Sequence, residues 1–94
     1  MEKMYIVRGD RSGVFFGAIK ERKGQEVEMT NVRKLWYWNG AGAVEQLSQD
    51  GVSDKKGSKF TVIVDSIIIT DAIEILPCTE KAIKSIGEVR EWRA

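Results

Sequence analysis

The sequence has 94 residues and contains no histidine, one cysteine and one proline. Without histidine, the chain lacks the most common general base of enzymes and the most common metal ligand. The single cysteine, Cys78, cannot form a disulfide within the chain or a cysteine zinc cluster. We therefore expect a protein that is not an enzyme and that has no metal site and no cofactor. A free thiol fits a reducing cytoplasm.

An excess of charge of one sign is also missing. Lys and Arg number 15 and Asp and Glu number 14, so the net charge is +1. Domains that bind nucleic acid through bulk charge usually show a clear basic excess, so we do not expect nucleic acid as the partner. Apolar runs such as 62–64 and 67–69 fall far short of the ~20 residues of a membrane-spanning helix. We expect no membrane partner.

Length limits the domain organisation. A chain of this size forms one small domain, so we predict a single domain over residues 1–94. Such a domain buries between ~60% and ~70% of the surface of its unfolded chain, which gives one marginal core. Self-association would add buried surface. We therefore expect a homo-oligomer.

Hydrophobic alternation and turn residues predict strands over 4–8, 14–19, 26–30, 31–38 and 59–64, and one bent strand or two short ones over 67–76 with the bend at Asp71. Gly17 inside the second strand indicates a bulge or a close backbone approach. A short helix is predicted over 43–49, ending at Gly51, and a late helix over 80–86 with Thr79 as its cap. The order lacks the strand–helix alternation of parallel sheets. We predict an α+β fold, a mainly antiparallel sheet or partly open barrel of six or seven short strands with one middle and one C-terminal helix.

Three segments carry a resemblance to known proteins. They are residues 13–17 (GVFFG), 31–41 (NVRKLWYWNGA) and 73–82 (IEILPCTEKA), together with Glu91-Trp92. With these segments the chain resembles a family of short phage and prophage proteins of uncharacterised function. The resemblance implies a phage or prophage source and location in the cytoplasm of the bacterial host. It implies no activity and no residue roles, although small phage accessory proteins often act on host defence.

The segment 33–42 combines aromatic rings, cations and glycines. Aromatic faces stack on nucleobases, Arg and Lys pair with phosphates, and glycine turns let backbone N–H groups approach an anion. The candidate ligand-binding residues are Arg33, Lys34, Trp36, Trp38, Asn39, Gly40 and Gly42, with Arg8 and Lys59 as further phosphate contacts. The same aromatics would equally serve as core or subunit interface. If 31–38 is a strand, Trp36 and Trp38 share one face, and the sequence leaves open which face is buried.

Four weaker candidates have simpler explanations. The lysines of 55–59 would close over a phosphate or form a solvated loop. The turn 40–42 would seat an anion at the helix start or be a plain turn. The carboxylates Asp65, Asp71 and Glu74 form no fixed pair, because residues three apart on a strand face opposite sides. Cys78 has no activating histidine, so we expect a buried, inert thiol.

Two functions follow. The first is a non-catalytic binding protein that sequesters a nucleotide-derived host defence signal as a homo-oligomer. The second is a phage accessory protein that inhibits a host defence protein by direct binding, since aromatic residues and Arg also anchor protein interfaces.

Overall fold

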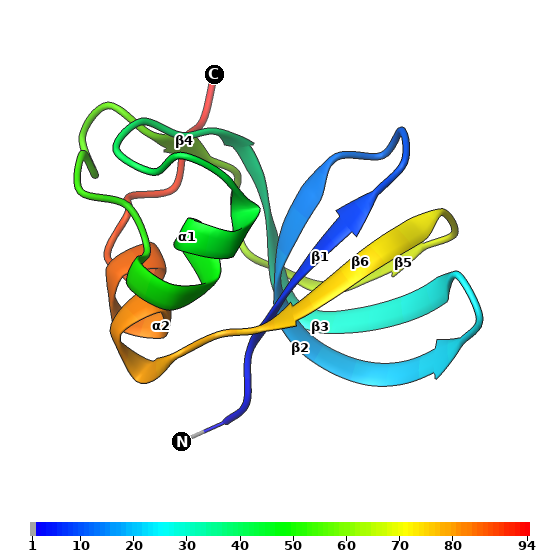
Figure 1. Ribbon diagram of the computed structural model, residues 1–94. Helices are drawn as coiled ribbons and strands as arrows, with labels where there is room; N and C mark the ends of the chain where they lie inside the picture. Colours follow the sequence, from blue (N-terminus) through cyan, green and yellow to red (C-terminus); the bar gives the residue numbers. More distant parts are fainter. Residues whose placement is uncertain (1) are drawn as a thin grey trace.

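The computed structural model describes residues 2–94. Within these residues the chain forms six strands and two short helices (Figure 1). In chain order they are β1 (Tyr5–Gly9), β2 (Val14–Lys23), β3 (Glu26–Tyr37), α1 (Val44–Asp50), β4 (Lys59–Phe60), β5 (Val64–Ile69), β6 (Ala72–Pro77) and α2 (Glu80–Gly87). The predicted α+β class is confirmed.

All the strand pairs are antiparallel, in the order β4–β3–β2–β1–β6, and β5 also pairs with β3. Besides β2, the long strand β3 has two partners along its other edge, because residues 27–32 lie opposite β5 and Leu35 and Tyr37 lie opposite β4. Strands β5 and β6 follow each other in the chain but pair at opposite edges. The sheet therefore curls (Figure 1) and stays open between β5 and β6 in the part of the chain described.

Both faces of the curled sheet are buried. Adjacent residues of one strand enter different cores, as Ile6 and Val7 do on β1 and Phe16 and Phe15 do on β2. This follows from the alternation of side chains along a strand. One core lies between the sheet and the helices and includes Ile6, Phe16, Leu35, Leu47 and Ile86. The other lies inside the curl and includes Val7, Phe15, Met29, Val32 and Ile69.

Several strand predictions need correction. Strand β2 continues to Lys23 and does not end at residue 19, and β5 begins at Val64 and not at residue 67. The predicted strands 26–30 and 31–38 are one strand, whose register against β2 shifts around Asn31. The φ of Asn31 is 49°, in the left-handed region that Asn tolerates better than most residues. Trp38 lies beyond the end of β3. The predicted strand 59–64 ends at Phe60, because the carbonyl of Thr61 accepts from a side chain, Arg33, and the N–H of Ile63 donates to Glu91.

The predicted irregularity at Gly17 and the predicted bend at Asp71 are both confirmed. The pairing of β2 with β3 shifts register around Gly17. Asp71 separates β5 from β6, and its carboxylate accepts hydrogen bonds from the Ser12 hydroxyl and from the N–H groups of Arg11 and Ser12. These bonds hold the pKa of Asp71 below its usual range, the Ser12 hydroxyl contributing most. Asp71 thus fastens the β1–β2 turn to the β5–β6 turn.

The two helices lie side by side on one face of the sheet (Figure 1). Thr79 caps α2 as predicted, its hydroxyl accepting from the N–H of Ala82 at 3.1 Å. The same residue donates its N–H to Ser48 and its hydroxyl to Gln49, which ties the start of α2 to the end of α1. Gly51 closes α1 with a φ of 74°. Neither helix of residues 2–94 is long and apolar enough to cross a membrane.

Gly17 generates the first prediction. A Cβ at this position would lie 2.8 Å from Val32 Cβ and 2.9 Å from Val32 Cα, so the neighbouring backbone would have to shift. We expect Gly17→Ala to lower the free energy of unfolding by ~1–3 kcal/mol, the usual cost of overpacking. Urea unfolding measures the change. Gly87→Ala is the matched control, because an added Cβ there meets nothing within 4 Å. Equal stability of the two variants would contradict the close approach at Gly17.

Candidate functional site

Trp36 and Trp92 form an exposed aromatic pair at the end of β3. Their ring centroids lie 5.0 Å apart and their planes are within 11° of parallel. Trp36 is 54% exposed and Trp92 41% exposed. Exposed apolar surface of this kind, rimmed by polar residues, is typical of an interaction site. Trp36 comes from β3 and Trp92 from the C-terminal tail, so only the folded chain assembles the pair.

Lys59 lies beside this pair. Its Nζ atom is 5.7 Å from the Trp36 ring centroid and 5.6 Å from that of Trp92. Lys59 reaches this position because β4 pairs with the end of β3, where Tyr37 is its partner. An ammonium at this distance from an aromatic ring is attracted by the ring quadrupole. Trp36 and Lys59 are therefore two predicted site residues that the fold brings together.

A groove of about 670 Å³ adjoins the pair, and we call it the basic groove. It is lined by Lys55, Lys56, Ser58, Lys59, Glu88, Arg90, Glu91, Trp92 and Arg93. Five of these residues are cationic and two are acidic, whereas the whole chain carries a net charge of only +1. The fold therefore concentrates positive charge at one place, next to exposed aromatic rings.

Both acidic residues of the basic groove are engaged. Glu91 accepts from the N–H of Ile63 at 2.8 Å and from Arg93 at 3.0 Å, and these bonds hold its pKa below the usual range. Glu88 accepts from Lys55 Nζ at 2.7 Å, and this bond and the Lys55 charge lower the pKa of Glu88. Both carboxylates are therefore ionised at neutral pH.

Arg33 is buried, with only 2% of its surface exposed, whereas a phosphate contact requires an accessible side chain. Its Nε donates to the Thr61 carbonyl at 3.0 Å, and its other nitrogens donate to the carbonyls of Phe60, Ile86 and Val89 at 3.3, 3.2 and 2.9 Å. Burial lowers the pKa of Arg33, and the charge of Glu91 partly offsets this. The guanidinium is thus a structural fork that joins β3 to β4 and to the end of α2, and it is not exposed to a ligand.

Three other predicted residues lie apart from the tryptophan pair. Lys34 is half-buried, with Nζ 5.7 Å from the Phe15 ring centroid. Trp38 is partly buried and packs against the core under the helices. Arg8 lies on β1 and pairs with Glu74 at 3.1 Å. Of the two tryptophans predicted from the segment 33–42, Trp36 is therefore exposed and Trp38 packs in the core.

The predicted loop residues are engaged within the chain. The side-chain amide of Asn39 donates to Asp54 at 3.0 Å, and the Gly40 carbonyl accepts from the N–H of Ser53. The N–H of Gly42, offered as part of an anion seat, donates to Gln46 Oε1 at 2.8 Å. These contacts tie the β3–α1 loop to the α1–β4 loop and to α1 itself.

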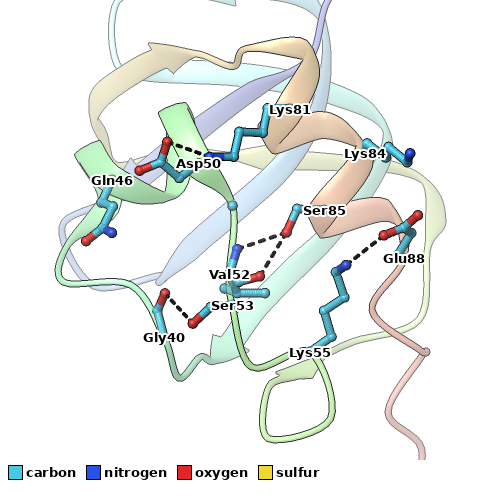
Figure 2. A pocket seen from close by; sticks show the side chains of 11 residues that line it. Gly40, Gln46, Asp50, Val52, Ser53, Lys55, Lys81, Lys84, Ser85 and Glu88 are labelled. Atoms are coloured by element: carbon cyan, nitrogen blue, oxygen red, sulfur yellow. Dashed lines mark hydrogen bonds and ion pairs between the residues drawn. The ribbon is translucent and has the colours of Figure 1, made fainter.

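A second hollow, of about 580 Å³, lies between the loops on either side of α1 and the two helices, and we call it the helix-side hollow (Figure 2). Its lining residues are Gly40, Gln46, Asp50, Gly51, Val52, Ser53, Lys55, Lys81, Lys84, Ser85 and Glu88. The Ser85 hydroxyl fixes one wall, since it bonds both the N–H and the carbonyl of Val52 at 3.0 Å. Lys55 and Glu88 line both hollows.

The acidic candidates do not gather. Asp71 holds the turns described above, Glu74 pairs with Arg8, and Asp65 is exposed on β5. In residues 2–94 no group of three or more His, Cys, Asp or Glu side chains is placed to hold a metal ion. Cys78 is half-buried, and burial raises the pKa of its thiol to about 11.

Sequence reasoning missed the part of the site that comes from the C-terminal tail. Trp92, Arg90 and Arg93 line the basic groove, although they lie more than 50 residues beyond Trp36. The Trp92 N–H donates to the Phe60 carbonyl at 2.9 Å, which holds the tail against β4. The available signal was compositional, because the tail sequence EVREWRA places a tryptophan between two arginines.

Comparison with known proteins places the chain in a family. A family model described as a domain of unknown function (DUF6948) matches residues 2–86, so the chain belongs to this family. Searches of the curated proteins and of the solved structures found no match. The expectation of an uncharacterised family is confirmed. The matched range ends before Glu88 and the tail residues of the basic groove.

The second prediction concerns Arg33. We expect Arg33→Met to lower the free energy of unfolding by about 3 kcal/mol or more, because it leaves four carbonyls without this donor. Arg33→Lys should lose somewhat less, since one ammonium cannot replace the planar fork. Urea unfolding measures both. Arg8→Met is the control, because an exposed ion pair contributes about 1 kcal/mol or less. Equal losses in Arg33→Met and Arg8→Met would contradict the structural role of Arg33.

The third prediction concerns Cys78. Because burial raises the pKa of its thiol to about 11, little thiolate is present at neutral pH. We expect the rate of reaction with a thiol reagent to rise about tenfold per pH unit up to roughly pH 10, well past the pKa of ~8.5 of a free cysteine. Stopped-flow spectroscopy measures the profile, with the urea-unfolded chain as control. A plateau near pH 8.5 in the folded protein would overturn the inert thiol.

Proposed function

We propose that this protein is a non-catalytic binding protein, and that its ligand is a nucleotide-like small molecule held at the tryptophan pair and the basic groove. The observation that carries the proposal is the stacked pair of Trp36 and Trp92 at the edge of a groove with five cationic side chains. Aromatic rings offer a stacking surface for a base, and the cations offer partners for phosphates.

The geometry of the pair suits stacking on its outer side. With centroids 5.0 Å apart, the rings of Trp36 and Trp92 already touch. A base inserted between them would have to push them apart by another ~3.5 Å, the contact distance of one more ring. The exposed outer faces accept a base without this movement. Lys59, beside both rings, would then lie close to the sugar or phosphate.

The basic groove has a size that suits such a ligand. Its volume of about 670 Å³ falls within the roughly 300–1,000 Å³ of small-molecule pockets. Trp92 and Lys59 line it and also belong to the aromatic cluster, so one ligand would contact both features. A local cluster of cations binds a phosphate without requiring an excess of positive charge over the whole chain, which agrees with the net charge of +1.

The same groove supports binding rather than catalysis. General acid–base catalysis works best with a group whose pKa lies near the working pH. The pKa values of Glu88 and Glu91 are instead lowered by their hydrogen bonds with Lys55 and with Ile63. We therefore propose that the ligand is released chemically unchanged.

The biological role we propose rests on the resemblance to phage and prophage proteins. In the cytoplasm of an infected host, a protein of this kind would sequester a nucleotide-derived signal of a defence system. Pockets usually bury most of a small ligand's surface, whereas the tryptophan pair is exposed on the single chain. A second subunit of a homo-oligomer would supply the missing cover.

An alternative function is inhibition of a host defence protein by direct contact. Four of the large exposed hydrophobic residues favour it: Trp36, Tyr37, Ile63 and Trp92. Tryptophan and tyrosine are enriched among the residues that dominate protein interfaces. A protein captured from host lysate at fixed stoichiometry would favour this alternative, provided that variants lacking Trp36 or Trp92 fail to capture it.

The fourth prediction tests the aromatic pair. We expect Trp36→Ala and Trp92→Ala each to weaken nucleotide binding roughly 5-fold to 150-fold, the value of one base stack at ~1–3 kcal/mol. The measurement is native mass spectrometry with a panel of linear and cyclic nucleotides, followed by denaturation and analysis of the released molecule. It reports subunit count, bound mass and chemical state together.

Ile68→Ala is the matched control, because Ile68 is also exposed but lies on β5, which pairs with the other half of β3. It should bind as the wild type does. Binding that persists without either tryptophan would contradict the aromatic site. An altered nucleotide in the released fraction would instead make the protein an enzyme.

A further inference from the structure

An ion pair stands between the two hollows. Lys55 Nζ and Glu88 Oε1 lie 2.7 Å apart, and both residues line the basic groove and the helix-side hollow. Figure 2 shows the pair bridging from the loop after α1 to the end of α2. The two side chains are 43% and 46% exposed, so solvent and solutes reach the pair.

The Glu88 carboxylate lies at a place where a helix would repel it. Glu88 follows α2 as its C-cap, next to the negative end of the helix dipole. Its pKa is nevertheless below the usual range, because of the Lys55 bond and charge and the charge of Lys84. The Lys55 and Lys84 charges therefore favour a carboxylate here in spite of the helix end.

Glu88 is also free to leave this position. Among the described residues, Lys55 is the one hydrogen-bond partner of its carboxylate. Glu91, the other acid of the basic groove, is held by the backbone N–H of Ile63 as well as by Arg93. An exposed ion pair of the Glu88 kind is weak, because solvent screens it and ordering two flexible side chains costs entropy. Rotation of one flexible side chain would expose Lys55 and open the wall between the hollows.

We propose that the Glu88 carboxylate occupies a phosphate-binding position between the two hollows, and that a ligand's phosphate group must displace it to bind there. Glu88 is then a built-in competitor that favours doubly charged phosphate groups over singly charged anions such as carboxylates. This rests on the proposed function only in taking the ligand to be anionic. It does not depend on the tryptophan pair.

The fifth prediction follows from this competition. We expect Glu88→Gln to bind inorganic pyrophosphate about fivefold more tightly than the wild type, because the competing ion pair is removed. Titration followed by NMR chemical shifts at low salt measures the affinity, and the gain should shrink as salt screens the charges. The backbone bonds of residue 88 do not involve the side chain, so the variant should fold.

Two further variants separate local competition from a change in net charge. Glu26→Gln makes the same charge change in the β2–β3 hairpin, at the end of the sheet away from the helices (Figure 1), and should leave the affinity unchanged. In a Lys55→Met background, Glu88→Gln should give no gain, because the cation that it frees is gone. Pyrophosphate affinity of Glu88→Gln within twofold of the wild type, or an equal gain in Glu26→Gln, would overturn the proposal.

The two proposals fail in different ways. Glu88→Gln could bind pyrophosphate more tightly while no variant binds a nucleotide. This result would contradict the proposed function and support the phosphate-binding position. Nucleotide binding that depends on Trp36 and Trp92, with no effect of Glu88→Gln on pyrophosphate, would keep the proposed function and remove the phosphate position.

Discussion

The buried guanidinium of Arg33 is the interaction on which the site depends. It donates to carbonyls of β4, of the end of α2 and of the segment that leads into the tail. An arginine in the interior is costly unless its donors are satisfied, and here carbonyl oxygens provide this in place of a carboxylate partner. Because β4 carries Lys59 and the tail carries Trp92, the fork fixes both segments relative to Trp36 on the same strand as Arg33.

Much of the fold could be predicted from local pattern. Local pattern located β1 and β6 and part of β2 and β5, and Thr79 and Gly51 marked helix ends correctly. The errors fall where tertiary contacts override the pattern. Asn31 does not end β3, because the strand keeps β2 on one edge while its partner on the other edge changes from β5 to β4 near that point. Residues 61–63 have strand-forming side chains, but their backbone groups bond to Arg33 and Glu91.

The site was less predictable, because its parts are far apart in the sequence. Trp36 and Lys59 were identified from residue type, and the fold brings them together. The partner that completes the stack, Trp92, belongs to a tail whose place depends on the Phe60 carbonyl. Residue type misled for Arg33, because carbonyls and phosphates offer a guanidinium the same kind of acceptor, and sequence alone does not separate interior from surface.

The charge of this protein has to be considered locally. A net charge of +1 over 94 residues suggests no attraction for anions. The fold, however, places the cations of the loop 55–59 and of the tail around one groove, and it engages the two acids there in hydrogen bonds. At ~10 Å screening length, a bound solute senses mainly these nearby charges and not the distant acids of the β2–β3 hairpin. Composition alone therefore predicts no long polyanion as a partner, whereas the arrangement of the same residues supports our proposal of a small phosphate-bearing one.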